Sequence, residues 1–189
     1  MISAAESHFA PMPAPILWIT GLSGSGKSTL AAAVVQALRP CHATPLLLDG
    51  DAVRDAFEPT SPEIDHSSAM RLQRAWRLAR LARFIALQGV PVVVATISLV
   101  HAVHAWSRSG DAPYAEVLMS SDLQILRLRN PALYGDELRP GKPHVVGMDI
   151  EAEYPLQPEL ILHQRFEPEQ VHEHLQQTLA LWQTLNVTH

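Results

Sequence analysis

The stretch Gly-Leu-Ser-Gly-Ser-Gly-Lys-Ser at residues 21–28 decides the fold of this chain. It matches the phosphate-binding P-loop pattern G-x-x-x-x-G-K-[ST]. Residues 15–20 predict a short buried strand before the loop, and residues 30–38 predict a helix after it. This context supports the motif, because its glycines let backbone N–H groups approach an anion at a helix N-terminus.

A P-loop predicts a bound nucleoside triphosphate with its metal ion. Lys27 is expected to reach the β- and γ-phosphates, and the Ser28 hydroxyl is expected to contact Mg²⁺. Arg129 comes just before Asn130 and Pro131, where it could flank the nucleotide at the hinge of a lid. The predicted nucleotide-binding residues are Gly21, Ser23, Gly24, Ser25, Gly26, Lys27, Ser28, Thr29 and Arg129.

The rest of the chain alternates predicted strands and helices. The strands are expected over residues 45–48, 91–97, 114–119 and 160–162, and the helices over residues 67–88, 101–109, 121–129 and from Pro168 onward. Such alternation predicts an α/β fold, a parallel sheet covered by helices on both faces. Ligands bind beyond the carboxyl ends of such strands, where the P-loop, Asp49, Asp51 and Ser98 would meet.

The length of 189 residues suits one domain. Residues 1–14 predict a flexible leader, and residues 15–189 predict a single P-loop kinase domain. Within it, residues 131–158 are rich in proline and glycine and show little periodicity. Such a segment is typical of a lid, which would keep water away from a phosphoryl group in transfer.

Composition argues against several classes of protein. A net charge of −5 argues against a general nucleic-acid or membrane-surface binder. No apolar run reaches transmembrane length, and the first residues lack a signal-peptide pattern. Because the single cysteine, Cys41, cannot form an internal disulfide, a reducing compartment is favoured and the cytoplasm is the expected location. His172 and His174 are expected to be solvated.

Two carboxylates follow the strand predicted at residues 45–48. Asp49 and Asp51 would share a face if the strand continued, although Asp-Gly-Asp is also a good turn. Asp51 is the candidate that accepts or orients the proton of an acceptor hydroxyl, and Asp49 is expected to act on the Mg²⁺ shell through water. Since an ordinary aspartate has a pKa of about 3.9, positioning is expected to matter more than proton abstraction.

Arginines supply the cations that an anionic acceptor requires. Arg54 lies one turn after Asp51, where it could meet an acceptor anion. Five further arginines recur at a spacing of three: Arg71, Arg74, Arg77, Arg80 and Arg83. This spacing turns each by about −60° around a helix, so that two or three could face a ligand. Arg71 and Arg77 are the candidates for that contact, and Arg80 and Arg83 are expected to be solvated.

Residues 17–162 together resemble adenylylsulfate (APS) kinase, a family that phosphorylates the ribose 3′-hydroxyl of APS with ATP. The P-loop alone is generic, but its combination with Asp-Gly-Asp-x-x-Arg and with the tail at residues 155–160 is specific. The matching residues are Gly21 to Thr29, Leu48-Asp49-Gly50-Asp51 with Arg54, Ile97-Ser98, Leu133-Tyr134, Gly147, Asp149, Glu153, Pro155 and Pro158-Glu159-Leu160.

The resemblance implies roles at these positions. Asp51, Lys27 and Ser98 would be catalytic, ATP and Mg²⁺ would be the cofactors, and a homodimer is a candidate assembly. Ser98 stands where the family has a serine associated with a phosphoserine intermediate, which in-line transfer does not require. Ser28 and Asp49 would serve the metal. The expected acceptor-binding residues are Asp49, Asp51, Arg54, Arg71, Arg77, Ser98 and Val145.

Departures from the family pattern cluster where APS would be held. Arg74 replaces an asparagine, and Thr96 and Val145 replace aromatic residues that could stack on an adenine. APS is the default acceptor, and a different small nucleotide such as cytidine diphosphoramidate is the alternative. A non-catalytic ATP-binding regulatory module, a gluconate- or shikimate-type kinase and a nucleic-acid end kinase are further alternatives, which the retained motifs and the net charge disfavour.

Overall fold

The computed structural model describes residues 11–40, 44–58, 67–135 and 145–187. Its centre is a five-stranded parallel sheet with the strand order β2-β3-β1-β4-β5. The P-loop strand β1 lies in the middle, and its Ile16 pairs with Val92 on one side and Tyr114 on the other. The strands are β1 (Ile16–Gly21), β2 (Leu46–Asp49), β3 (Val92–Thr96), β4 (Tyr114–Ser121) and β5 (Leu160–Gln164).

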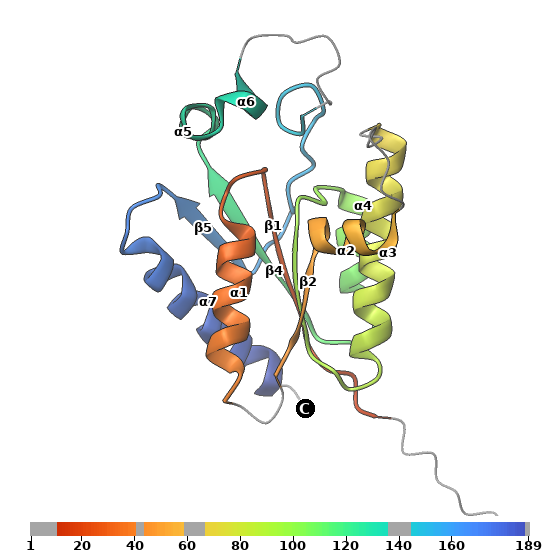
Figure 1. Ribbon diagram of the computed structural model, residues 1–189. Coiled ribbons are helices and arrows are strands. Elements are labelled where there is room, and N and C mark those ends of the chain that lie inside the picture. Colours follow the sequence, from red (N-terminus) through yellow and green to blue (C-terminus); the bar gives the residue numbers. More distant parts are fainter. Residues whose placement is uncertain (1–10, 41–43, 59–66, 136–144, 188–189) are drawn as a thin grey trace, which may run out of the picture.

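Helices cover both faces of the sheet (Figure 1). On one face α1 (Lys27–Leu38) and α7 (Gln170–Val187) share an apolar core with the sheet. On the other face α3 (Ser68–Ala86) and α4 (His101–Arg108) pack against the opposite side chains of the same strands. The predicted α/β fold, a parallel sheet with helices on both faces, is therefore confirmed.

Three short helices stand at the carboxyl ends of the strands, where ligands bind in such folds. They are α2 (Gly50–Phe57), α5 (Leu123–Arg129) and α6 (Pro131–Tyr134). The sequence interpretation did not include α2 or α6. It expected Asp49 and Asp51 to share a face if the strand continued, but the strand ends at Asp49 and α2 begins at Gly50. The Asp49 carboxylate instead caps α2, accepting the N–H groups of Asp51 and Ala52.

Other predicted boundaries shift by a few residues. The last helix begins at Gln170, so Pro168 precedes it. His174, predicted to be solvated, is buried on this helix, whereas His172 is exposed. Within the described ranges, no helix is long and apolar enough to cross a membrane.

The predicted leader and lid are described only in part. Residues 1–10 and 136–144 lie outside the described ranges. Ala14 donates its N–H to the carbonyl of Ala86 at 2.8 Å, which ties residue 14 to the end of α3. Tyr134 and Val145 flank the undescribed part of the lid and pack in an apolar cluster with Leu22 of the P-loop. The Tyr134 hydroxyl also donates to the carbonyl of Ser23 at 2.8 Å.

Candidate active site

The P-loop joins β1 to α1 with two glycines in left-handed conformations. Gly24 has φ +75°, and Gly26, the N-cap residue of α1, has φ +94°. L side chains rarely adopt such angles, so both positions favour glycine. The two glycines therefore let the loop turn tightly into the N-terminus of α1, as the sequence motif predicts.

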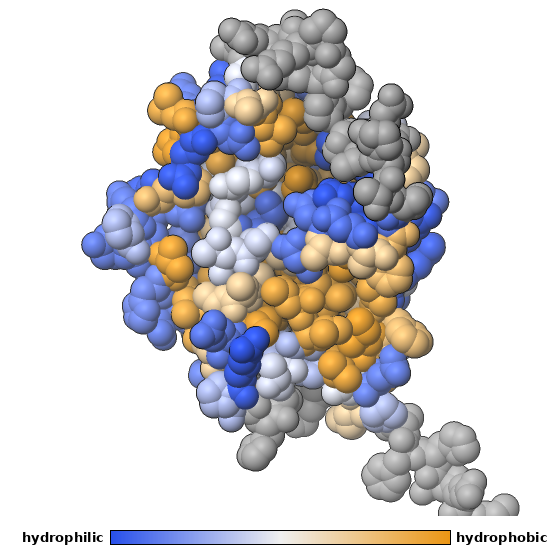
Figure 2. Space-filling model, in the orientation of Figure 1, coloured by the Kyte–Doolittle hydropathy of each residue, from blue (hydrophilic) through white to orange (hydrophobic). Residues whose placement is uncertain are grey.

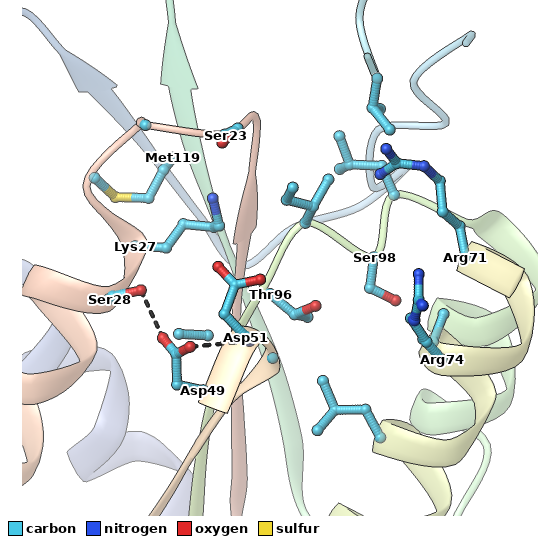
Figure 3. A pocket seen from close by; sticks show the side chains of 18 of the residues that line it. Ser23, Lys27, Ser28, Asp49, Asp51, Arg71, Arg74, Thr96, Ser98 and Met119 are labelled. Carbon is cyan, nitrogen blue, oxygen red and sulfur yellow. Dashed lines mark hydrogen bonds between the residues drawn. The ribbon is translucent and has the colours of Figure 1, made fainter. Parts of the chain in front are cut away.

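Lys27 is the buried cation of the site. Its ammonium donates to the carbonyl of Leu22 at 2.7 Å, within the P-loop itself. Burial lowers the pKa of Lys27 to about 8, and the charges of Asp51 and Asp49 oppose this shift. In Figure 3 the Lys27 ammonium points away from the Asp51 carboxylate and toward the P-loop. A phosphate group beside Lys27 would offset the cost of burying its positive charge.

A hydroxyl and a carboxylate meet between α1 and α2. Ser28 Oγ donates to Asp49 Oδ2 at 2.6 Å, while Asp49 Oδ1 accepts the N–H of Asp51 at 3.0 Å (Figure 3). Oxygen ligands of this kind suit Mg²⁺, and they stand directly beside the P-loop. Ser28 and Asp49 therefore fit the predicted metal site next to the nucleotide phosphates.

The acceptor side is formed by α2 and α3. Arg54 Nη1 contacts Asp51 Oδ1 at 2.7 Å, and its Nη2 contacts Asp55 at 3.0 Å. Arg71 and Arg74 enter the cavity from α3 (Figure 3), and Arg77 also lines it. In the space-filling view a hydrophilic band lies over α2 beside the pale surface of the P-loop (Figure 2). Cationic groups for an anionic acceptor thus face the phosphate loop.

Two of the predicted surface arginines contact tryptophans. Arg80 is exposed and lies over the ring of Trp76, with Cζ 5.5 Å from the ring centroid. Arg83 is only partly exposed. Its Cζ lies 3.4 Å from the ring centroid of Trp106, and its guanidinium donates to the Trp106 carbonyl. The prediction that Arg83 is simply solvated is therefore wrong, because α4 provides an aromatic face beside α3.

One cavity of about 1470 Å³ connects the two sides. It brings together nearly all of the predicted site residues. Gly21 and Ser25 do not line it: Gly21 ends β1 and Ser25 is fully buried in the loop. The predicted residues that line it are Ser23, Gly24, Gly26, Lys27, Ser28, Thr29, Asp49, Asp51, Arg54, Arg71, Arg77, Ser98, Arg129 and Val145.

Ser98 and Val145 lie in the wall of the cavity after β3 and at the end of the lid. The Ser98 hydroxyl is buried and has no hydrogen-bond partner among the described residues. Val145 is buried against Leu22 and Leu99, and its N–H donates to Asp149 at 3.2 Å. Thr96 also lines the cavity. These side chains leave a wall without an aromatic ring at positions 96 and 145.

Sequence reasoning missed three residues of the site. Phe166 lies under Arg129, whose Cζ is 4.0 Å from the ring centroid, and Phe166 has φ +65°. Gln164 lines the same end of the cavity. Glu58 lines the opposite end, where it pairs with Arg74 at 2.6 Å. Phe166 and Gln164 could have been suspected because they stand at the carboxyl end of the last strand. For Glu58 the sequence holds no such signal.

Comparisons with known proteins agree with this geometry. The profile of the adenylylsulphate kinase family matches residues 13–163. Cytidine diphosphoramidate kinase of Campylobacter jejuni is 30% identical over 141 residues, which cover 74% of this chain and 81% of that protein. Adenylyl-sulfate kinase of Erwinia tasmaniensis is 33% identical over 161 residues, covering 84% of this chain and 79% of that protein.

A solved structure gives the same result. The APS kinase CysC of Mycobacterium tuberculosis in complex with AMPPNP and APS matches with a TM-score of 0.77 and 29% identity, covering 92% of this chain and 99% of that chain. Enzymes of this family are phosphotransferases that act on a hydroxyl group. The P-loop, the carboxylates of α2 and the matched length all lead to one assignment. The chain belongs to the adenylylsulphate kinase family.

Proposed function

We propose that this protein is an ATP-dependent kinase that transfers the γ-phosphoryl group to the ribose 3′-hydroxyl of a small nucleotide. One observation carries the proposal. A single cavity is lined both by Lys27 and Ser28 of the P-loop and by Asp51 and Arg54 of α2. A phosphate cradle and a carboxylate beside cations are the parts that phosphoryl transfer between two bound molecules requires.

The residues of the cavity have separate roles in this proposal. Lys27 offsets charge on the β- and γ-phosphates, and Arg129 flanks the donor base. Asp51 orients the acceptor hydroxyl and takes its proton as the acceptor oxygen bonds to the γ-phosphorus and the bond to ADP breaks. Ser28 and Asp49 would hold Mg²⁺, which when bound offsets the phosphate charge. Ser98 contacts the acceptor, and no phosphoserine is required.

The acceptor is APS by the default of the family, and the relative from Erwinia tasmaniensis supports this choice. A cytidine diphosphate-linked nucleotide such as cytidine diphosphoramidate is the second candidate. The relative from Campylobacter jejuni carries that name. Thr96 and Val145, which line the cavity, supply no aromatic ring for stacking on adenine, and a changed base pocket of this kind is what a different acceptor base would require. A non-catalytic ATP-binding module is disfavoured by the cavity geometry of Lys27, Ser28 and Asp51.

The test is ADP release with Mg²⁺–ATP against APS, cytidine diphosphate-linked nucleotides, gluconate, shikimate and water. Lys27→Met serves as the control for contaminating activity. Turnover with APS supports the default acceptor. Turnover with the cytidine compound alone supports the second candidate. ATP binding without any acceptor-dependent turnover would contradict the kinase proposal and support the non-catalytic regulatory module.

A further inference from the structure

The helix that carries Asp51 and Arg54 packs its apolar side chain Val53 against the core, and Val53 is only partly buried. None of the eight residues of α2, all of which the structure describes, is buried. At its N-terminal end, the Asp49 carboxylate caps the helix and Gly50 packs closely on Thr96. A Cβ built on Gly50 would lie only 2.9 Å from Thr96 Oγ1. The N-terminal end is therefore fixed by local contacts, and the C-terminal end needs another anchor.

Glu58 and Arg74 provide a contact at that second end. The N–H of Glu58 donates to the carbonyl of Arg54 at 2.8 Å and so ends α2. Its carboxylate accepts two hydrogen bonds from Arg74, at 2.7 Å from Nε and 2.6 Å from Nη2. Each side chain is only 20% exposed. Two parallel charge-assisted bonds of this kind define both the distance and the orientation of the two groups.

The partner helix is firmly anchored. The face of α3 behind Arg74 is buried in the core through Ala75, Leu78, Ala79 and Ala82. Arg74 therefore extends from a rigid element toward an exposed one. The hydrogen bonds from Arg74 hold the pKa of Glu58 below its ordinary value, against the opposing effect of desolvation, so the pair stays ionised at neutral pH.

We propose that Glu58 and Arg74 are positioning residues: their ion pair fixes the end of α2 on α3 and so places Asp51 at the acceptor hydroxyl. This inference rests on the proposed kinase function. It also assigns the guanidinium of Arg74 to Glu58, so that Arg54, Arg71 and Arg77 contact the acceptor anion. In the alternative, Arg74 itself binds the acceptor. It predicts a higher KM for the acceptor in Arg74→Gln and no effect of Glu58→Gln.

Hydrogen exchange tests the pair without any need for turnover. The variants are Glu58→Gln, Arg74→Gln and the exchanged pair Glu58→Arg with Arg74→Glu; the matched control is Arg80→Gln, on the same helix. We expect amides of residues 50–57 to exchange about fivefold or more faster in both single variants, because local opening reports the loss of tertiary contacts. The exchanged pair should recover at least half of the protection, and Arg80→Gln should match the wild type.

Kinetics then connect the pair to catalysis. With the acceptor that the wild type uses, kcat should fall about tenfold or more in both single variants, because a misplaced reacting group slows the chemical step, while ATP affinity stays unchanged. Unchanged exchange in the single variants, or no recovery in the exchanged pair, overturns the inference. A higher KM for the acceptor in Arg74→Gln, together with no change in Glu58→Gln, overturns it as well. A wild type that turns over no nucleotide overturns the proposed function instead, and the exchange result still decides the pair.

Discussion

Ser28 Oγ donates a hydrogen bond to Asp49 Oδ2 at 2.6 Å, which joins the first turn of α1 to the N-cap of α2. The two residues come from different strand–helix units that meet at the carboxyl edge of the sheet. Asp49 thereby has two roles at once. One of its oxygens faces the hydroxyl expected to contact the metal, and the other accepts the backbone N–H groups that begin α2.

Asparagine separates these two roles of Asp49. Asparagine caps helices about as well as aspartate, so Asp49→Asn should change the free energy of unfolding by less than about 0.5 kcal/mol, whereas Asp49→Ala should lose about 1 kcal/mol. Both variants should bind Mg²⁺–ATP about tenfold more weakly, since they lack the carboxylate charge beside the ion. Calorimetry with and without Mg²⁺ measures the ATP affinity, and urea unfolding measures the free energy of unfolding. Wild-type Mg²⁺–ATP affinity in Asp49→Asn would remove Asp49 from the metal site.

Asp51 should govern the chemical step and not the binding of ATP. Asp51→Asn keeps the size of the side chain but loses the charge that orients the acceptor hydroxyl and accepts its proton, so kcat should fall by about 10²–10⁴-fold. The dissociation constant of ATP should stay within about twofold. Asp55→Asn is the matched control, because Asp55 also contacts Arg54 from the same helix. Equal losses in the two variants would mean that only the orientation of Arg54 matters.

Most of the fold could be predicted from local sequence patterns. The P-loop requires its glycines, and each buried strand is a short apolar run, so the sheet and the convergence of Lys27, Ser28 and Asp51 could be predicted. The helix α2 could not be, because it opens on Gly50 and Asp51, which favour turns in isolation. It forms because Asp49 caps it and Arg74 holds its end.

Long-range contacts account for the remaining errors. Arg83 looked solvated because nothing near it in the sequence places Trp106 beside its guanidinium. His174 is buried because its face of α7 turns inward, and burial lowers its pKa. The pair of Arg129 and Phe166 joins segments on either side of the lid. Such contacts depend on how helices rotate against the sheet, and helical periodicity alone does not specify that rotation.

Glu116 is a buried carboxylate of β4 with three side-chain partners. It is 2% exposed and lies 3.0 Å from His104 Nδ1, 2.9 Å from the Tyr114 hydroxyl and 3.2 Å from Arg108 Nη2. Burial would raise the pKa of Glu116, but its hydrogen bonds with His104 and Tyr114 and the charge of Arg108 bring it below the ordinary value. The carboxylate therefore stabilises the fold at neutral pH, and this contribution is lost as the pH falls through that lowered pKa.

Removing this carboxylate should be costly. Glu116→Ala should lower the free energy of unfolding at pH 7 by about 3 kcal/mol, because it leaves the buried His104 ring and the Tyr114 hydroxyl without their hydrogen-bond partner. ATP affinity of the folded variant should stay close to the wild type, since Glu116 does not line the cavity. Glu173→Ala, at an exposed glutamate of α7, should change stability by less than about 0.5 kcal/mol. Urea unfolding at several pH values measures the free energy of unfolding of the two variants. If Glu116→Ala were as stable as Glu173→Ala, the network around Glu116 would contribute nothing net to stability.

Lys27 should make ATP binding depend on pH. Its pKa is lowered from 10.5 to about 8 in the unliganded protein because the ammonium is buried. Bound phosphates favour the charged form and raise this pKa, so ATP binding should take up a proton above pH 8, and affinity should fall by up to about tenfold per pH unit there.

The stability of the unliganded protein should change in the opposite direction. Between pH 8 and 10.5 the unfolded chain binds more protons at Lys27 than the folded chain does, so this group makes stability rise with pH across that window.

Calorimetry in two buffers of different ionisation enthalpy measures the proton uptake on ATP binding. Lys27→Arg is the control, because an arginine stays protonated throughout this range and should show no uptake. Equal uptake in the wild type and in Lys27→Arg would assign the proton to another group and leave Lys27 charged before ATP arrives.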